Sequence, residues 1–272
     1  MQQKFNMRAV TSKHTQLYQF EIFDYFHEVK HFVSTRIGGY SQPPFHGFNL
    51  GFGVEDDTQV VLKNRMALAE SVGIPFDWFV FPRQTHSVNV AKVDTSHCGL
   101  GTKDRESAIA DTDALTTNEK NVLLIVQVAD CVPILLLDSK NAAIAAIHAG
   151  WKGTVGEIVV NTINKMNQQY GTQAEDIIAA IGPSAGPCCY EVGDEVLDKV
   201  NKNKFDKVVK KHNESKILNL WEYNRILLIE SGVKPENIEV SNLCTICNDD
   251  KFFSSRKGKG VTGRFVAGIM LQ

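Results

Sequence analysis

Residues 122–148 read VLLIVQVADCVPILLLDSKNAAIAAIH and contain three apolar runs in close succession. Val122–Val128, Val132–Leu137 and Ala142–Ile147 are each short and rich in Val, Ile, Leu and Ala. Runs of this length without polar alternation are typical of strands that are covered on both faces. Pro133 fits a strand start or an edge, because it lacks a backbone N–H. We therefore predict that these residues form the centre of a buried sheet.

Helical patterns flank this centre. A helix over Val60–Val72 is predicted to open at Asp57 or Thr58 and to end at Gly73. The spacing of Thr154 and Glu157 matches a capping box, which predicts a second helix from Thr154. Further helices are expected at Glu195–Val200 and Leu220–Ser231, and further strands at His31–Ser34, Trp78–Phe81, Val88–Val93, Ile177–Ile181, Ile238–Ser241 and Phe265–Met270. The sequence shows no linker or repeat, so we predict a mixed α/β (α+β) fold in a single domain over residues 1–272.

The composition is that of an ordinary folded protein with little net charge. Hydrophobic residues make up 43% of the chain and charged residues 22%, and the formal net charge is −2. This balance argues against a nucleic acid or an anionic membrane as a partner. The opening residues, MQQKFNMRAV, lack the apolar core of a signal peptide. We therefore expect a cytoplasmic protein with reduced thiols, either a monomer or a homodimer.

Four of the six cysteines form two close pairs along the chain. Cys188 and Cys189 are adjacent, and Cys244 and Cys247 form a C-x-x-C pattern, which is half of a common metal site or a redox pair. The sequence contains no second C-x-x-C, and the βαβ context of a thioredoxin motif is missing. We interpret both pairs as packing residues.

Three potential metal ligands occupy similar places relative to the predicted strands. His86 and Cys131 each lie between two strands, and His148 follows a strand. A His, Cys, His set suits zinc, and three protein ligands leave a fourth position for water or substrate. Their spacing matches no zinc finger, however. From these residues alone, a zinc site, a cysteine nucleophile and inert packing all remain open.

Glycine-containing turns lie close to these residues and to two arginines. The turn HAGWKG, residues 148–153, leads into the helix predicted from Thr154, and a helix N-terminus favours anions. Arg36 lies in TRIGG, and Arg256 lies in SSRKGKG. An arginine in such a loop can present two donors to a phosphate or a carboxylate. The alternative is that the glycines only permit tight turns and that the arginines are solvated.

A series of motifs along the chain is recognisable. In order they are TRIGG, FNLG, RQTHS, TDALTT, ADCVPILL, HAGWKGTVGEIV, IGPSAGPCCYEV, and FFSSR followed by TGR. Together they resemble the bacterial laccase-domain family, long labelled polyphenol oxidase and described as a purine nucleoside phosphorylase family. The resemblance runs from about residue 31 to the C-terminus. Ser87, Ser184 and Ser255 stand where members often carry Gly, Cys and Tyr, and none of these departures removes a metal ligand.

The resemblance implies a fold, a metal and an activity. The fold is a four-layer α/β/β/α arrangement with mixed sheets, shared with a class of cysteine hydrolases. His86, Cys131 and His148 are implied to bind one catalytic Zn²⁺. The implied activity is phosphorolysis of adenosine, inosine and S-methyl-5'-thioadenosine to the free base and (methylthio)ribose 1-phosphate, with adenosine deamination as a second activity. The implied partners are thus purine nucleosides and phosphate.

Roles for other residues follow from this implied chemistry. A carboxylate is needed to move a proton during deamination, and Asp113 and Asp130 are the candidates. Arg36, Asn49 and Arg256 are the candidates for binding substrate, the two arginines as phosphate contacts.

Three rival interpretations remain. In a cysteine hydrolase, Cys131 would be the nucleophile and His148 its base. A copper-dependent polyphenol oxidase would need several copper ions and many histidines, whereas this chain has eight histidines and no His-x-His pair, which disfavours Cu²⁺. A zinc-stabilised binding module would close its site with four protein ligands, and only three are convincing here.

Overall fold

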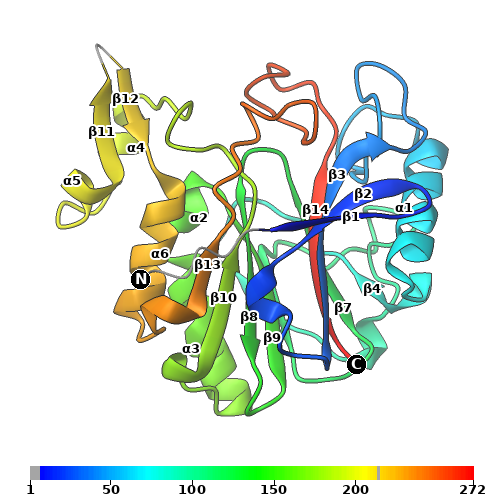
Figure 1. The fold of residues 1–272 in the computed structure, drawn as a ribbon, viewed down its shortest axis with the longest axis horizontal. Helices are drawn as coiled ribbons and strands as arrows, with labels where there is room; N and C mark the ends of the chain where they lie inside the picture. The colour runs from blue at the N-terminus through cyan, green and yellow to red at the C-terminus, as the bar shows by residue number, and fades with distance from the viewer. Residues whose placement is uncertain (1–6, 213–214) are drawn as a thin grey trace.

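Two six-stranded sheets form the centre of the fold, in a computed structural model that describes residues 7–212 and 215–272 (Figure 1). Residues 1–6, which are part of the stretch assessed for a signal peptide, lie outside the described residues. Each sheet mixes parallel and antiparallel pairs. The described residues form one mixed α/β domain, as the sequence predicted.

The first sheet has the strand order β1-β2-β3-β14-β7-β4. Its strands are, in that order, Arg8–Thr11, Thr15–Gln19, Val29–Gly38, Phe265–Leu271, Leu123–Val128 and Phe79–Val80. Neighbours run antiparallel except for β4 and β7, which are parallel. The sequence did not predict β1 or β2, and it underestimated the length of β3.

The second sheet has the strand order β13-β10-β8-β9-β6-β5. Its strands are, in that order, Ile238–Val240, Ile177–Ile181, Val132–Asp138, Ala143–Ala149, Ala114–Thr117 and Val90–Lys92. The outer pairs β10–β13 and β5–β6 are parallel, and the central pairs are antiparallel. The predicted central strands are therefore confirmed, but they divide between two sheets: β7 lies in the first, and β8 and β9 in the second.

Side-chain alternation along the central strands produces the layers. On β7, Leu124 and Val126 pack between the two sheets, whereas Leu123 and Ile125 pack toward α1 (Thr58–Val72). On β8, Leu135 and neighbouring odd-numbered positions face the first sheet, while the even-numbered positions face the helices on the far side. Those helices are α2 (Trp151–Val155), α3 (Ile158–Tyr170) and α6 (Leu220–Glu230). The order of layers is thus α/β/β/α, which confirms the expected architecture.

Shorter elements complete the chain. The short helices are α4 (Asp194–Leu197) and α5 (Phe205–Val208), and the hairpin consists of β11 (Val209–His212) and β12 (Ser215–Leu218). Single 3₁₀ turns are η1 (Glu21–Phe23), η2 (Phe76–Trp78), η3 (Thr95–His97), η4 (Ala174–Asp176) and η5 (Pro235–Asn237). The hairpin and α5 project from one end of the molecule (Figure 1). In contrast, η1 contributes Ile22 and Phe23 to the core between the two sheets.

The helix boundaries confirm one prediction and correct another. Helix α1 is capped by Asp57, whose carboxylate accepts backbone N–H groups, and it ends at Gly73 in the left-handed region. The capping box predicted at Thr154 is wrong. Helix α2 begins earlier, with Gly150 as its N-cap, and α3 begins only after Glu157, which has a φ of 62° and makes no side-chain cap. The chain turns at this point because α3 must lay its apolar face on the second sheet.

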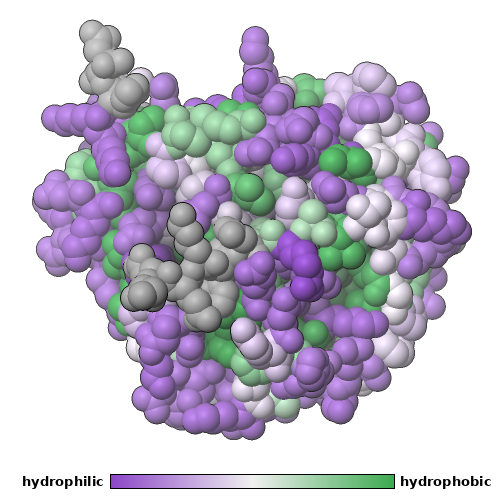
Figure 2. All heavy atoms as spheres, in the orientation of Figure 1, coloured by the Kyte–Doolittle hydropathy of each residue, from purple (hydrophilic) through white to green (hydrophobic). Residues whose placement is uncertain are grey.

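The face of the molecule seen in Figure 2 is mainly polar. Figure 2 shows hydrophilic side chains over most of the visible face, with hydrophobic ones in small separate areas. In the described parts of the chain, no helix combines the length and the apolar character needed to cross a membrane.

Candidate functional site

The strand register of the second sheet brings the candidate ligands to one place. Pro133 at the start of β8 pairs with His148 near the end of β9, so Cys131 lies beside His148. On the other side of β9, Ala114 of β6 pairs with Ile147, which places Asp113 next to His148. The parallel strand β5 then positions the preceding segment, which carries His86, against Asp113. Four segments distant in sequence therefore meet at one end of this sheet.

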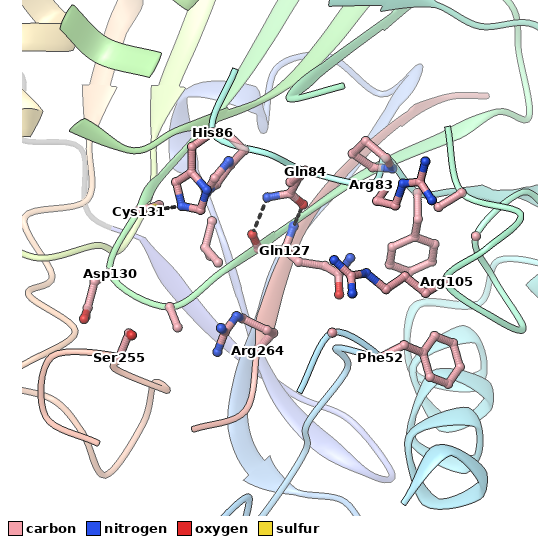
Figure 3. A pocket seen from close by; sticks show the side chains of 18 of the residues that line it. Phe52, Arg83, Gln84, His86, Arg105, Gln127, Asp130, Cys131, Ser255 and Arg264 are labelled. Atoms are coloured by element: carbon pink, nitrogen blue, oxygen red, sulfur yellow. Dashed lines mark hydrogen bonds between the residues drawn. The ribbon is translucent and has the colours of Figure 1, made fainter. Parts of the chain in front are cut away.

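The three side chains converge as a metal site requires. One ligand atom from each of His86, Cys131 and His148 lies within 4.8 Å of the others. The Cys131 Sγ is 3.8 Å from the His86 Nε2 (Figure 3). The two imidazole rings are nearly perpendicular, with centroids 4.9 Å apart. Zinc–ligand distances of about 2.0–2.3 Å place tetrahedral ligand atoms roughly 3.3–3.8 Å apart, so this donor set fits a zinc ion.

Asp113 orients two of the three ligands. Its Oδ1 accepts a hydrogen bond from the His148 Nδ1 at 2.7 Å and one from the His86 backbone N–H at 3.1 Å. Its Oδ2 accepts the backbone N–H and the hydroxyl of Ser87, at 2.7 and 2.8 Å. The bond to Nδ1 leaves the Nε2 of His148 as its ligand atom, which is the carboxylate–histidine arrangement found behind zinc ligands. The hydrogen bond from the His86 backbone N–H to Asp113 also supports the backbone of His86, whose φ of 61° lies in the left-handed region.

The electrostatics of the cluster favour a thiolate. Burial by itself raises the pKa of the Cys131 thiol, but the charge and hydrogen bond of His148, with those of His86, lower that pKa to about 6. Burial likewise acts to lower the pKa of His148, and the Cys131 thiolate and Asp113 reverse this effect and raise it to about 9. For Asp113, burial raises the pKa, and hydrogen bonds from His148 and Ser87 lower it well below its usual range. A thiolate is the form of cysteine that binds metal.

The backbone around the cluster leaves no room for larger residues. A Cβ added at Gly150 would lie 2.9 Å from the Cys131 Sγ and 3.1 Å from the His86 Cδ2. The glycine that precedes α2 is therefore required by the site itself, rather than only by the turn.

The cluster opens into a pocket of about 720 Å³. This volume is within the range of sites for small organic molecules. The lining includes the aromatic residues Phe52, Phe81 and Tyr190, the amides Gln84 and Gln127, and the basic residues Arg65, Arg83, Arg105, Arg256, Lys259 and Arg264. Asp130 is the one carboxylate in this lining. The pocket therefore has an excess of positive charge, which favours an anionic ligand.

Two of the three expected substrate contacts lie outside this lining. Arg36 donates from Nη1 to the Asp249 carbonyl at 2.9 Å and from Nη2 to the His46 carbonyl at 3.1 Å, and it stacks on Phe253. Asn49 is fully buried. Its Oδ1 accepts the Arg264 backbone N–H at 2.8 Å. The structure thus gives Arg36 and Asn49 contacts that hold loops together, and it leaves Arg256 in the pocket.

Asp130 lies at the pocket, and both of its carboxylate oxygens accept hydrogen bonds from protein groups. Its Oδ1 accepts the Thr245 hydroxyl at 2.6 Å, and its Oδ2 accepts the Ser254 hydroxyl at 3.0 Å and the Arg256 backbone N–H at 2.6 Å. Like Asp113, it has both oxygens occupied. The structure therefore gives both predicted proton carriers contacts that position other groups.

Arg264 is a pocket residue that the sequence analysis did not place among the candidate substrate contacts. Figure 3 shows its side chain pointing toward the centre of the pocket. Its Nη1 donates to the carbonyls of Thr262 and Gly263, and no hydrogen bond from its Nη2 to protein is found among the described residues. Burial lowers the pKa of this guanidinium, and the charges of Cys131 and Asp130 oppose that effect. The TGR motif contains this residue, but the sequence does not show that β14 pairs with β7, which places Phe265 opposite Val128 of the pocket lining.

Known proteins resemble this chain over nearly its whole length. A family model described as multi-copper polyphenol oxidoreductase laccase matches residues 30–272. A purine nucleoside phosphorylase of Bacteroides thetaiotaomicron is 35% identical over 264 residues, which cover 96% of this chain and 98% of that protein. A protein named adenosine deaminase RL5, from an unknown prokaryotic organism, is 39% identical over 245 residues, with coverage of 89% and 93%. The crystal structure of the Bacillus licheniformis hypothetical protein YfiH has a TM-score of 0.92 at 35% identity, covering 98% of this chain and 99% of that one.

Proposed function

The chain belongs to the family described as multi-copper polyphenol oxidoreductase laccase, and we propose that it is a zinc-dependent purine nucleoside phosphorylase. The observation that carries the proposal is a His, Cys, His metal site at the end of a basic pocket large enough for a nucleoside and a phosphate. The names of the two relatives described above support this activity and adenosine deamination as a second one. We place the enzyme in the cytoplasm, where a thiolate ligand stays reduced.

The basic side chains account for the phosphate. In phosphorolysis a phosphate oxygen attacks the anomeric carbon of the ribose, the bond from that carbon to the purine nitrogen breaks, and the base leaves with the bonding electrons. Arg264 and Arg256 line the pocket near Cys131 and can hold the phosphate by charge-assisted hydrogen bonds. Holding it in place removes much of the entropic cost of bringing two substrates together.

The aromatic and amide side chains account for the nucleoside. Phe52 and Tyr190 offer flat apolar surfaces on which a purine ring can stack, whereas Phe81 is buried beneath the Arg65 guanidinium. The side chain of Gln84 is fixed by two hydrogen bonds of 2.8 Å to the backbone of Gln127: its Nε2 donates to the carbonyl, and its Oε1 accepts the N–H. The proposed substrates are adenosine, inosine and S-methyl-5'-thioadenosine.

The metal site fits zinc better than copper. A thiolate and two imidazoles form a borderline-soft donor set, and a three-ligand site keeps one position open to the pocket. A zinc ion held by His86, Cys131 and His148 would supply Lewis-acid chemistry to the pocket. Asp113 acts by holding His148 and the His86 backbone, and Asp130 acts by holding the loop that carries Arg256. Both carboxylates are therefore proposed as positioning residues.

The decisive experiment is a phosphate-dependence assay. The purified chain is incubated with inosine, with and without phosphate, and the products are separated by chromatography. We expect hypoxanthine and ribose 1-phosphate in equal amounts, and neither product without phosphate. Adenosine without phosphate should yield inosine. Release of base at the same rate in the absence of phosphate would contradict the phosphorylase proposal, because it would indicate hydrolysis.

One observation favours a second candidate, a cysteine hydrolase. Cys131, His148 and Asp113 form a chain of contacts like a nucleophile, its base and the carboxylate that orients the base. His86 distinguishes the two functions, because a third donor beside Cys131 and His148 serves a metal ion and is not needed by a nucleophile and its base. Metal analysis separates them: a metal-free chain with full activity, inactivated by alkylation of Cys131, would establish the hydrolase.

A further inference from the structure

A second cluster of metal-binding side chains lies outside the pocket. The Sγ atoms of Cys188, Cys189, Cys244 and Cys247 all lie within 4.8 Å of one another. The Cys247 Sγ is 3.4 Å from that of Cys188 and 3.2 Å from that of Cys189. A disulfide requires about 2.05 Å, so these thiols are not bonded to each other. The sequence indicated packing for each pair separately, whereas the structure brings the two pairs together.

The sheet topology explains why the pairs meet. Strands β10 and β13 are parallel neighbours, so the loops that follow them leave the sheet at the same end. A bridge between Ser184 and Cys244 extends this pairing beyond the strands. The Ser184 N–H donates to the Leu243 carbonyl at 3.2 Å, and the Thr245 N–H donates to the Ser184 carbonyl at 3.0 Å. The two loops are therefore held side by side by backbone contacts that do not involve the thiols.

The C-x-x-C turn has the features of a metal-binding turn. The Gly186 backbone N–H donates to the Cys244 Sγ at 3.3 Å, and the backbone N–H groups of Ile246 and Cys247 also interact with that sulfur. Such N–H donors stabilise a thiolate ligand. A Cβ at Gly186 would lie 2.6 Å from the Trp221 ring and 3.0 Å from the Cys244 Cβ, so only glycine permits this approach.

We propose that Cys188, Cys189, Cys244 and Cys247 bind a second zinc ion in a closed, four-thiolate site. A Zn–S distance of about 2.3 Å gives tetrahedral sulfur separations of roughly 3.8 Å, which small side-chain adjustments reach from the observed positions. Four protein ligands leave no open position, so this site is structural, in contrast to the open site at Cys131. Its existence does not depend on the proposed phosphorylase activity.

A metal ion bound by these four cysteines would stabilise one wall of the pocket. Thr245, within the C-x-x-C turn, donates its hydroxyl to the Asp130 Oδ1 at 2.6 Å, and Asp130 precedes Cys131. Tyr190, next to Cys189, lines the pocket. Cross-linking the two loops through a metal ion therefore fixes groups on the pocket side of both. Loss of this ion should impair nucleoside turnover without removing any ligand of the catalytic metal.

The test counts metal ions on the full chain purified under reducing conditions. We expect native mass spectrometry and elemental analysis to find two zinc ions per chain. The Cys247→Ser variant and the His86→Ala variant should each retain one zinc ion per chain. The double variant should retain no zinc, and the control Cys98→Ser should retain both ions. Cobalt loading identifies the ligands, because thiolate-to-metal charge transfer increases with the number of thiolates. It should be strong in His86→Ala and weak in Cys247→Ser.

Several results would overturn the site. They are a single metal ion in the unmodified chain, two ions retained in Cys247→Ser, iron in place of zinc, or a disulfide within the cluster in protein kept reduced. If Cys247→Ser fails to fold, thiol alkylation of the unmodified chain tests whether the four cysteines bind a metal ion. We expect the four thiols to be protected until a chelator removes the metal, and rapid alkylation of all four before chelation would refute the proposal. Absence of phosphorolysis with two zinc ions bound would refute only the proposed activity.

Discussion

At the scale of single residues, the site depends on a few atoms with little tolerance for change. Cys131 is the shared neighbour of both histidines, and Gly150 lies against it with no space for a side chain. Arg264 brings a positive charge to the same pocket. Cys131 and Gly150 can be altered with a small change in volume and Arg264 by truncation, so their contributions can be separated by single substitutions.

Cys131→Ser tests whether the thiolate binds metal. Serine keeps the size of the side chain but is a poor zinc ligand. We expect zinc affinity to fall by about 100-fold or more, since even the loss of an outer-shell partner costs about 10–100-fold, and turnover should fall with it. Zinc content and phosphorolysis rate are measured on the same preparation. A variant that keeps its catalytic zinc and loses only its activity would support a thiol nucleophile instead.

Gly150→Ala tests the space behind the metal site. The added Cβ would lie 2.9 Å from the Cys131 Sγ, so the thiolate or the backbone must move. We expect weaker zinc binding and lower turnover, measured by competition with a chelating dye. Gly193→Ala is the matched control, because its Cβ meets nothing closer than 4.0 Å and its φ of −81° suits alanine. Equal zinc affinity in both variants would show that the site can accommodate the Cβ added at position 150.

Arg264→Ala tests the phosphate contact. Hydrogen bonds to charged groups contribute about 1.5–3 kcal/mol, so the KM for phosphate should rise by roughly tenfold or more, and the KM for nucleoside should change less. Arg8→Ala, in the exposed first strand, is the control. An unchanged phosphate KM in Arg264→Ala would exclude this guanidinium from the phosphate site.

At the scale of elements, the segment from α2 to α3 is where the chain departs from its local pattern. Thr154 and Glu157 have the spacing of a capping box, yet the helix begins before Thr154 and is interrupted after Val155. Glu157 adopts the left-handed region, which is unfavourable for a residue with a Cβ. The apolar face of α3 packs on the second sheet, and this packing offsets the local cost.

Glu157→Gly should therefore stabilise the protein, with Glu157→Ala as the matched control. Both variants remove the carboxylate, but only glycine relieves the left-handed strain. We expect the glycine variant to exceed the alanine variant by about 1 kcal/mol in free energy of unfolding. Urea denaturation measures this difference. A glycine variant less stable than the alanine variant would mean that the strain is smaller than the entropy that glycine gains on unfolding.

At the scale of the whole molecule, the two sheets are joined by a buried carboxylate as well as by apolar packing. Glu239 on β13 of the second sheet accepts the Ile22 backbone N–H at 2.8 Å, next to the end of β2 in the first sheet. Burial raises the pKa of Glu239 to about 7, and the charges of Glu21 and Asp24 add to this effect. Ionisation of this side chain therefore costs folding free energy through its burial, although the Ile22 hydrogen bond favours the charged form.

Glu239→Gln should make the protein less sensitive to rising pH. Because the pKa of Glu239 is about 7 in the folded chain and 4.5 ordinarily, the folded state binds the extra proton, and stability is lost as pH rises through this range. The free energy of unfolding of the unmodified protein, minus that of the variant, should fall by roughly 2–3 kcal/mol between about pH 5 and about pH 8.

A second buried group acts in the opposite direction. Burial lowers the pKa of His31 to about 4, so this residue adds stability as pH rises toward its ordinary value of 6.5. The contribution of His31 is the same in the unmodified protein and in Glu239→Gln, so it cancels in the difference between their free energies of unfolding.

Chemical denaturation of both proteins at several pH values measures the effect of Glu239. A difference in free energy of unfolding that stays constant with pH would show that Glu239 is not the responsible group.

Patterns within the sequence predicted the central strands and helix α1 with both of its ends, and motifs pointed to three candidate metal ligands. Strand and cap signals are local, because they depend on which side chains are buried and on which backbone groups need partners within a few residues. The ligands were identified through a family resemblance, and spacing alone left a zinc site, a nucleophile and packing open.

Which distant residues share a site follows from tertiary contacts. Strand register placed Asp113 behind His148, and the pairing of β14 with β7 placed Arg264 in the pocket, whereas Arg36 lies outside it. Parallel pairing of β10 and β13 brought four cysteines together that appeared as two unrelated pairs. Strand register and layer packing depend on the whole buried core, so they cannot be predicted from any short stretch of the sequence.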